Sequence, residues 1–428
     1  MTLIGLLFFI AIVISFKFPI RFTVAILLVS TVFSASSVLN IADKSIIPYL
    51  FCSIFVCIRI LFYKKGRIII RGDIWSPAIF FVIYASLITI LGPIFFEGME
   101  VVGSNLDESW WEGYDKLAFS IGNIAQIIYL VINFSTILFL LSLKNEISTD
   151  FLRNTFLLVV EISLFFGFWE FISKVAGVIP FPSSVLLNNV GQGLDGELRT
   201  TGVLGAMRMS SLYSEASYFG AFLGAAFWSL LFLPKSIRRN IDIIVAAIAL
   251  LLNMSGTGVV TFIGGSILYL MFNSNHIRTI FFLFFSAFVL LFILSQFEFS
   301  EIFYNMLSGK ADSASGQVRI GTTMKNLEIF VDSFFLGIGR GSTRSSSFII
   351  DMLASVGLLG SSLFMIFYYR LIKEKWKIES VQYICIYCWV LLIGQVVAIP
   401  DFSFSAMWFG LYMAACVNVQ KNGKLCYI

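Results

Sequence analysis

The sequence predicts an all-α polytopic membrane protein with about 12–14 transmembrane helices. Hydrophobic residues make up 58% of its 428 residues, whereas charged residues make up only 13%. Soluble domains carry about 25% charged residues, so this composition excludes a soluble protein of two or three domains. Apolar runs of about 20 residues recur along the chain, which is the length that an α-helix needs to cross a bilayer. We therefore expect residues 1–428 to form a single integral membrane domain.

Thirteen apolar runs define the expected helices. The first run has no basic stretch before it and no small-residue cleavage site after it, so we expect a membrane span and not a signal peptide. The short first run and the hairpin at 240–273 give the weakest signals. The runs lie near 2–16, 22–40, 46–63, 77–96, 119–143, 151–178, 213–233, 240–254, 257–273, 279–296, 346–369, 381–399 and 404–418.

The basic loops set the expected orientation of these helices. Lys and Arg concentrate in the cytoplasmic loops of membrane proteins, and here they gather at 63–67, 234–239 and 370–375. Alternation of the spans then places three longer polar loops on the outer, periplasmic face, and the second and third of these are the larger. The three loops lie near 97–118, 179–212 and 297–345.

Composition and loop length also exclude several classes of function. The net charge of +4 comes from Lys and Arg in short loops, so it does not indicate a nucleic-acid partner. The cytoplasmic loops are too short for a nucleotide-binding module and no GxxxxGK[ST] motif occurs, which disfavours ATP-driven transport and a cytoplasmic sugar-nucleotide enzyme. Cys385 and Cys388 lie in an apolar run without a neighbouring His, so no metal or redox site is predicted. The single histidine, His276, is expected in a cytoplasmic loop.

Arginines in the two larger outer loops are the first candidate functional residues. The positive-inside rule predicts few of them there. A guanidinium group binds phosphate through two parallel hydrogen bonds, so outer arginines favour an anionic lipid head or a lipid-linked diphosphate as ligand. Ordinary ion pairs with Glu197, Asp312 or Asp332 are the alternative. The arginines are Arg199 and Arg208 in the loop at 179–212, and Arg319, Arg340 and Arg344 in the loop at 297–345.

Glu215 is the candidate general base. It follows Arg208 by seven residues, at the point where a polar loop gives way to an apolar run. On a helix this spacing is about two turns, roughly 10.5 Å along one face. Ionisable groups at mid-bilayer cost about 2.5–3.5 kcal/mol each, which favours a functional reason for them, and a general base contributes about 10²–10⁴-fold to a rate. The alternative is a carboxylate stabilised by the helix dipole in the first turn.

Four other features have a structural and a functional interpretation. Glu170 and Lys174 have the spacing of a helical ion pair, and Glu161 is expected to find a partner on a neighbouring helix. Residues 253–258 (NMSGTG) lie at the outer tip of the expected hairpin, where they could supply hydroxyl or backbone donors. The glycine-rich stretch 337–341 could cradle a phosphate with its N–H groups, and a turn into the next helix explains it equally well.

Three separated stretches resemble the superfamily of bacterial O-antigen polymerases and ligases, and in particular its Wzy-type polymerases. The first carries the Arg…Glu-Pro/Ala-(Ser/Asn) pattern of that superfamily, with Ala216 where Pro is frequent. The second stands where these proteins have a short Ser-rich stretch before a span, and the third resembles their last large periplasmic loop with the helix beyond it. The stretches are 208–220, 253–258, and Arg319 with 334–341 and 352–360, within roughly residues 195–370.

The resemblance implies a metal-independent glycosyltransferase without a cofactor, with a GT-C-like helical fold in the bacterial inner membrane. Its substrate would be an undecaprenyl-diphosphate-linked oligosaccharide held in membrane lipid, and a sugar hydroxyl would displace the diphosphate at the periplasmic face. A chain-length regulator is a further candidate partner. The resemblance implies Glu215 and Arg208 as catalytic residues. The implied diphosphate- and substrate-binding residues are Arg319, Arg340, Arg199, Arg344, Tyr213 and Ser217.

Three functions compete within this interpretation. A polymerase joins lipid-linked repeat units into a long chain, whereas a ligase transfers the finished glycan to the lipid A core. Ligases resemble one another in a periplasmic histidine in the last large loop, and residues 297–345 contain none, so the polymerase is favoured. A lipid-linked-oligosaccharide flippase or another transporter is the third candidate. It would draw charges from many helices into a central cavity, whereas the charges here concentrate in the outer loops.

Overall fold

The computed structural model describes residues 1–41, 44–64, 69–103, 114–143, 146–190, 207–272, 314–417 and 425–427. These residues form an all-α protein with fourteen α-helices and three two-stranded antiparallel sheets, which confirms the prediction that the protein is all-α. Five helices are long and apolar enough to cross a membrane. They cover Ile74–Phe95, Ile121–Leu141, Thr149–Ala176, Phe348–Lys377 and Glu379–Ala398.

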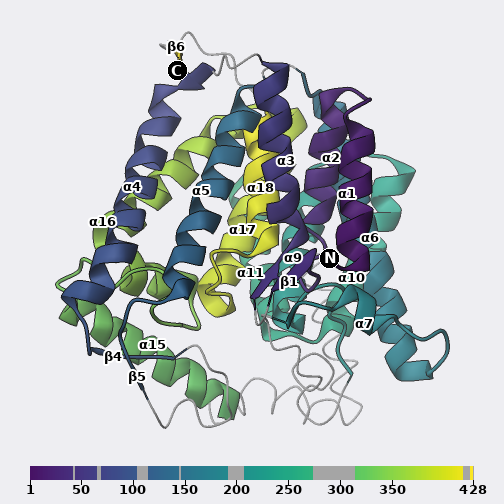
Figure 1. The fold of residues 1–428 in the computed structure, drawn as a ribbon. Helices are drawn as coiled ribbons and strands as arrows, with labels where there is room; N and C mark the ends of the chain where they lie inside the picture. The colour runs from purple at the N-terminus through teal and green to yellow at the C-terminus, as the bar shows by residue number, and fades with distance from the viewer. Residues whose placement is uncertain are drawn as a thin grey trace.

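The helices follow the apolar runs of the sequence in order (Figure 1). The first half contains α1 (Leu3–Ser15), α2 (Ile20–Ser30), α3 (Pro48–Tyr63), α4 (Gly72–Phe95), α5 (Ile121–Leu141), α6 (Thr149–Ala176) and α7 (Ser183–Leu186). The second half contains α9 (Ala216–Leu231), α10 (Ile237–Asn253), α11 (Gly256–Phe272), α15 (Ala314–Asp332), α16 (Phe348–Lys373), α17 (Gln382–Ala398) and α18 (Ser405–Cys416). The strands are β1 (Leu39–Ile41), β2 (Lys44–Ile46), β3 (Ile69–Arg71), β4 (Glu100–Val101), β5 (Asp115–Lys116) and β6 (Leu425–Tyr427).

The long helices lie side by side in a bundle, and the shorter elements gather at its two ends (Figure 1). Helix α15 lies across one end, where α7 and the β4–β5 pair also lie. We call this end of the molecule the α15 end. The β3–β6 pair lies at the opposite end, near the C-terminus. The charge pattern assigns the loops near 97–118, 179–212 and 297–345 to the outer face. The described parts of these three loops lie at the same end of the bundle.

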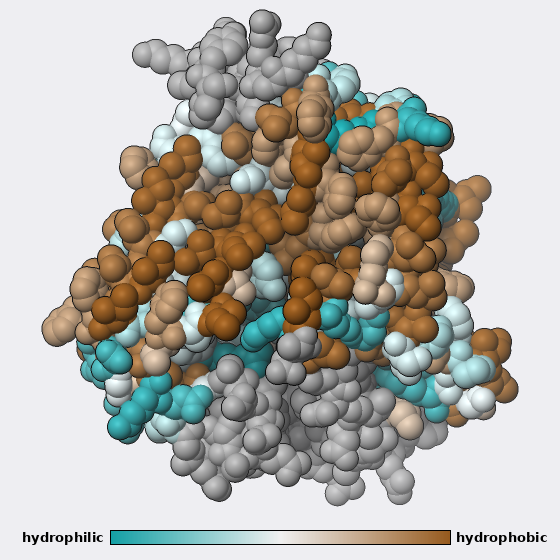
Figure 2. Space-filling model, viewed as in Figure 1, coloured by the Kyte–Doolittle hydropathy of each residue, from teal (hydrophilic) through white to brown (hydrophobic). Residues whose placement is uncertain are grey.

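The sides of the bundle are strongly apolar, as a membrane-embedded surface requires. On the face shown in Figure 2, hydrophobic side chains cover the sides of the bundle, and hydrophilic side chains lie toward the α15 end and at the opposite end. In α4, Phe80, Ile83 and Leu87 are 60%, 51% and 52% exposed and recur at helical spacing. Monomeric soluble proteins rarely expose apolar patches of this extent. The protein is therefore a multi-pass membrane protein.

Helix α9 packs at the centre of the second half, against α10, α11 and α17. Its small residues allow this close approach, as is common between helices in membranes. A Cβ atom at Gly224 would lie 2.1 Å from Thr261 Oγ1 of α11, and one at Gly220 would lie 2.1 Å from Ser255 Oγ. Because α9 is held on several sides, the residues at its N-terminus have fixed positions at the α15 end.

Two elements differ from the predictions. The run at 22–40 is helical only to Ser30, because Ser30 and Thr31 bond back to carbonyl groups one turn earlier and the polar residues that follow leave the helix. The predicted loop at 297–345 contains the 19-residue helix α15. This helix is too polar to be recognised as an apolar run. The predicted span at 279–296 lies outside the described residues.

Candidate functional site

A buried ion pair fixes the backbone of the segment that carries Arg208. Glu170 of α6 is 1% exposed and accepts hydrogen bonds from the backbone N–H groups of Ser210 and Ser211 at 2.9 and 2.6 Å. Lys174 pairs with Glu170 at 2.9 Å and donates to the carbonyl group of Arg208 at 3.3 Å. The predicted Glu170–Lys174 ion pair is therefore confirmed. It holds the Arg208 segment in place as well as stabilising the helix.

The tip of the α10–α11 hairpin holds the same segment from another side. Asn253 donates from its side-chain nitrogen to the carbonyl groups of Met209 and Ala216 at 2.7 and 2.8 Å. The Ser255 hydroxyl in turn donates to the Asn253 side-chain oxygen and accepts from the N–H of Gly258. These polar groups of the stretch 253–258 are therefore used inside the protein, where they position the start of α9.

Arg208, Glu215 and Arg319 lie close enough to interact electrostatically, although Arg319 is 111 residues from Arg208 along the chain. Burial and the neighbouring Arg319 guanidinium lower the pKa of Arg208, whereas Glu215 raises it. Glu215 stands at the position before the first turn of α9, but its side chain does not bond to the helix N–H groups. It accepts a hydrogen bond from the Ser217 hydroxyl at 2.9 Å. Simple capping of the helix therefore does not account for this carboxylate.

Tyr218 of α9 connects these residues with the loops around them. Its phenol interacts electrostatically with Glu215 and Arg319, and also with Arg344 and Asp401. The sequence segments that carry these groups are far apart, but all reach the N-terminus of α9. We call Arg208, Glu215, Tyr218, Arg319, Arg344 and Asp401 the outer charge cluster.

The two α15-side arginines of the outer charge cluster are held together by polar contacts. Asn326 of α15 donates to the carbonyl group of Arg344 at 2.7 Å and accepts from the Thr343 hydroxyl at 3.0 Å. The hydroxyl groups of Thr322 and Ser346 lie 2.9 Å apart. The helix that carries Arg319 and the loop that carries Arg344 therefore form one structural unit beside α9.

The charges of this cluster do not neutralise one another at close range. Within the part of the chain that the structure describes, none of its three arginines or two carboxylates forms an ion pair within 4.0 Å of another described residue. Asp332, one of the proposed ion-pair partners, is exposed and unpaired there, while Glu197 and Asp312 lie outside the described residues. Two guanidinium groups brought together repel each other unless an anion binds between them. The arrangement therefore suits an anionic ligand.

Arg340 has a different setting from the other arginines. It is 5% exposed, lies 3.8 Å from the Asp351 carboxylate and stacks over the Phe402 ring at 4.4 Å. The backbone N–H groups of residues 337–340 all bond to protein oxygens, at Ser333, Ala354, Ser355 and Thr89. The stretch 337–341 is therefore a turn that leads into α16, and these N–H groups are not free to cradle a phosphate.

The remaining predicted residues separate into four groups. Tyr213 is buried, with its ring 5.4 Å from those of Phe219 and Phe222, so it belongs to the helix core. Ser217 belongs to the site through its bond to Glu215. Glu161 forms a two-point ion pair with Arg238 of α10 at 2.6 and 2.7 Å, which confirms that its partner lies on a neighbouring helix. Arg199 and His276 lie outside the described residues.

Sequence reasoning missed Asp401 and Asp351. Asp401 lies in the short loop between α17 and α18, and Asp351 lies in the first turn of α16. Like Glu215, both aspartates lie at an end of an apolar run. A carboxylate in that position is the sequence feature by which they could have been identified as candidates. Among the described residues, no group of three or more His, Cys, Asp or Glu side chains is placed to hold a metal ion.

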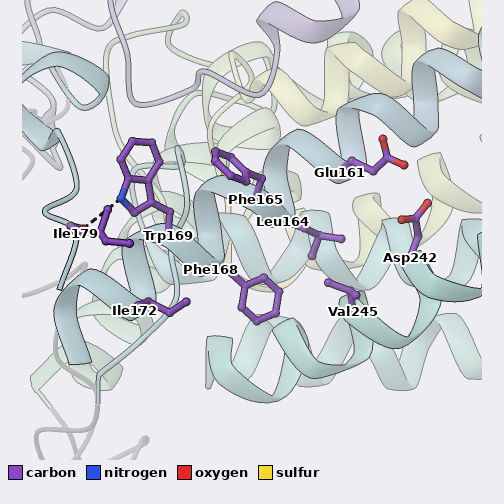
Figure 3. A pocket seen from close by; sticks show the side chains of 9 residues that line it. All are labelled: Glu161, Leu164, Phe165, Phe168, Trp169, Ile172, Ile179, Asp242 and Val245. Carbon is purple, nitrogen blue, oxygen red and sulfur yellow. Dashed lines mark hydrogen bonds between the residues drawn. The ribbon is translucent and has the colours of Figure 1, made fainter. Parts of the chain in front are cut away.

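An apolar groove of about 650 Å³ lies on the side of the bundle between α6 and α10 (Figure 3). Glu161 and Asp242 lie at one end of the groove and Trp169 and Ile179 at the other. Glu170 follows Glu161 by nine residues, or about two and a half helical turns, so it points to the opposite side of α6. None of the residues that line the groove belongs to the outer charge cluster, so the two features are distinct.

No protein-family model matches the chain, and no curated protein matches it either.

Proposed function

We propose that this protein is a glycosyltransferase that polymerises undecaprenyl-diphosphate-linked glycan units at the periplasmic face of a bacterial inner membrane. The observation that carries the proposal is the approach of both Glu215 and Arg319 to Arg208 at the α15 end. Two cations beside one carboxylate match a reaction in which a diphosphate leaves and a hydroxyl group loses its proton. A GT-C-like arrangement of about 12–14 spans belongs to the same proposal.

The proposed reaction has one bond-forming and one bond-breaking event. A hydroxyl group at the non-reducing end of a new lipid-linked unit attacks the anomeric carbon of the growing glycan. The bond from that carbon to the diphosphate oxygen breaks, and undecaprenyl diphosphate leaves with the bonding electrons. Glu215 takes the proton of the attacking hydroxyl group.

Arg208 and Arg319 stabilise the charge that develops on the diphosphate. Each charge-assisted hydrogen bond contributes about 1.5–3 kcal/mol. Their positions are preorganised, because Glu170, Lys174 and Asn253 fix the Arg208 segment while Asn326 ties α15 to the loop of Arg344. Groups fixed in advance stabilise a developing charge without reorganising during the reaction. The guanidinium groups supply the positive charge, in keeping with the metal-independent chemistry that the family resemblance implies.

The alternative function is that of a ligase, which transfers finished glycan to the lipid A core. Deletion of the gene distinguishes a polymerase from a ligase. Without a polymerase the cell makes core carrying one repeat unit, whereas without a ligase it makes bare core. Loss of a flippase would also leave bare core, because repeat units would then fail to reach the outer face at all. We expect the first result on gel electrophoresis of the lipopolysaccharide.

Variants of the site test the catalytic assignment. Arg208→Ala is expected to lower polymerisation by about 10²–10³-fold, because it removes one preorganised donor. Glu215→Ala is expected to lower it by about 10²–10⁴-fold, because it removes the base. In both strains single repeat units should still reach the outer face. The measurement is the chain-length distribution together with surface labelling of the single units.

Arg153→Ala and Asp332→Asn are the matched controls. Arg153 is paired with Asp150 at the start of α6, away from the α15 end, and Asp332 is an exposed carboxylate outside the outer charge cluster. Both should keep the wild-type chain length. Long chains in both Arg208→Ala and Glu215→Ala would remove the proposed site.

A further inference from the structure

The loop between α17 and α18, residues 399–404, packs against α3, α9 and α16 at the α15 end. The Tyr49 hydroxyl of α3 donates to the carbonyl group of Ser403 at 3.0 Å. Phe402 stacks on Phe348 of α16 with ring centres 6.2 Å apart, and Phe404 meets Tyr218 of α9 edge to face at 5.1 Å. These contacts fix the position of Asp401, which lies between Pro400 and Phe402 in the sequence.

Asp401 faces a group of phenols as well as charges. It interacts electrostatically with Tyr49, Tyr129 and Tyr218, which come from three different helices. It also interacts with the buried Arg340 and with Asp351. The electrostatic neighbours of Arg208, in contrast, are Arg319 and Glu215. The two carboxylates of the outer charge cluster therefore have different surroundings: Glu215 lies near Arg208 and Tyr218, whereas Asp401 lies near three tyrosines and the buried Arg340.

Half of the Asp401 carboxylate is available to a ligand. One oxygen accepts a hydrogen bond from the backbone N–H of Ser403 at 2.8 Å, which stabilises the turn. Among the described residues, none donates a hydrogen bond to the other oxygen, and none pairs with the carboxylate as a cation within 4.0 Å. The side chain is half-buried, and so is that of Tyr129 beside it.

We propose that Asp401 binds the acceptor sugar, accepting hydrogen bonds from its hydroxyl groups, with Tyr129 and Tyr218 completing an acceptor subsite. The inference rests on the proposed glycosyl transfer and names the part of the site that holds the attacking unit. Carboxylates accept strong hydrogen bonds from hydroxyl donors, and tyrosine rings offer an apolar body with a polar tip. Tyr218 interacts with both carboxylates and therefore connects the acceptor subsite with the diphosphate subsite.

The experiment separates acceptor binding from donor use. The donor is the undecaprenyl-diphosphate-linked repeat unit, and the acceptor is an alkyl glycoside of the same unit. The alkyl glycoside has no diphosphate, so it can accept a glycan but cannot donate one. Transfer is measured against acceptor concentration with the full-length purified protein. Hydrolysis of the donor without acceptor reports on the diphosphate subsite alone.

Asp401→Asn is the main variant, because an asparagine oxygen can still accept the bond from Ser403 and preserve the turn. We expect the KM for the acceptor to rise by about 10-fold or more, which is the effect of losing a hydrogen bond to a charged group. The kcat should change by less than about threefold and donor hydrolysis should stay at the wild-type rate, since uniform binding affects KM alone. Asp332→Asn is the matched control and should change neither quantity.

Several results overturn the inference. An unchanged acceptor KM in Asp401→Asn contradicts it, and so does a fall in kcat at unchanged KM. If Asp401→Asn also lost donor hydrolysis, its effect would not be limited to the acceptor subsite. Tyr129→Phe would then test that subsite, because it removes only one hydroxyl group beside Asp401. We expect a rise of about three- to tenfold in acceptor KM for that variant, and no rise contradicts the inference. A wild-type protein that transfers nothing from the lipid-linked donor would instead remove the proposed function itself.

Discussion

At the scale of single residues, the arginines at the α15 end have two distinct roles. Arg208, Arg319 and Arg344 belong to a group of charges without close ion pairs among the described residues. Arg340 is buried between Asp351 and the Phe402 ring. Sequence alone could not separate these roles, because all four arginines occur in predicted outer loops. The two roles differ in how far the arginine side chain is buried. Arg340 is buried because it contacts α16 and the loop at 399–404.

Replacement of Arg340 should destabilise the protein more than replacement of Arg208. Arg340→Ala leaves the Asp351 carboxylate buried without its cation, which costs about 3–5 kcal/mol when a buried ion pair is broken on one side. The measurement is thermal unfolding of the detergent-solubilised protein. Arg340→Met combined with Asp351→Leu should recover much of the lost stability, since no buried charge then remains.

Arg208→Ala is the comparison for this prediction. Its side chain is half-buried and unpaired with any described residue, so its removal should lower activity with a far smaller change in unfolding temperature. Equal unfolding temperatures for Arg340→Ala and Arg208→Ala would contradict the structural role of Arg340.

At the scale of elements, the order and approximate bounds of most helices could be predicted because lipid requires continuous apolar runs. The 240–273 hairpin, a weak signal in the sequence, is formed by α10 and α11. Helix α15 could not be predicted in this way, because its residues contact other parts of the protein at the end of the bundle. Asp401 was missed for a related reason: its neighbours are Tyr49, Tyr129 and Tyr218, more than 180 residues away.

The hairpin tip gives a prediction at this scale. Asn253→Ala removes the two donors that hold the carbonyl groups of Met209 and Ala216. Each buried carbonyl group left unsatisfied costs about 1–3 kcal/mol, so the unfolding temperature should fall. The proposed polymerisation activity should fall as well, because Arg208 and Glu215 then lose their fixed positions.

Asn240→Ala is the matched control, since Asn240 lies on the same helix and is exposed. It should retain both the unfolding temperature and the activity of the wild-type protein. Normal activity in Asn253→Ala would show that the hairpin tip does not position the site.

At the scale of the whole molecule, the predicted orientation can be tested directly. Lys235 lies in an exposed basic loop before α10, and Asp332 is exposed at the end of α15. A cysteine at position 332 should react with a membrane-impermeant maleimide from outside the cell. A cysteine at position 235 should react only after the inner membrane is opened, because basic loops remain in the cytoplasm.

The wild-type protein, with its own cysteines, is the control for background labelling. Cys52, Cys385, Cys388 and Cys416 are buried, so little reaction is expected from them. Labelling of positions 235 and 332 from the same side would contradict the orientation and, with it, a periplasmic site.

The contacts of the outer charge cluster have a mechanical consequence for the whole molecule. Arg208 is anchored to α6 and to the tip of α10, whereas Arg319 and Arg344 are carried by α15 and the loop tied to it by Asn326. If the proposed function is correct, a pyrophosphate bound by these arginines from both directions links two separately supported parts of the bundle as a brace. Because a ligand that binds only the folded state raises stability by mass action, such a brace should make the occupied protein harder to melt than the empty one.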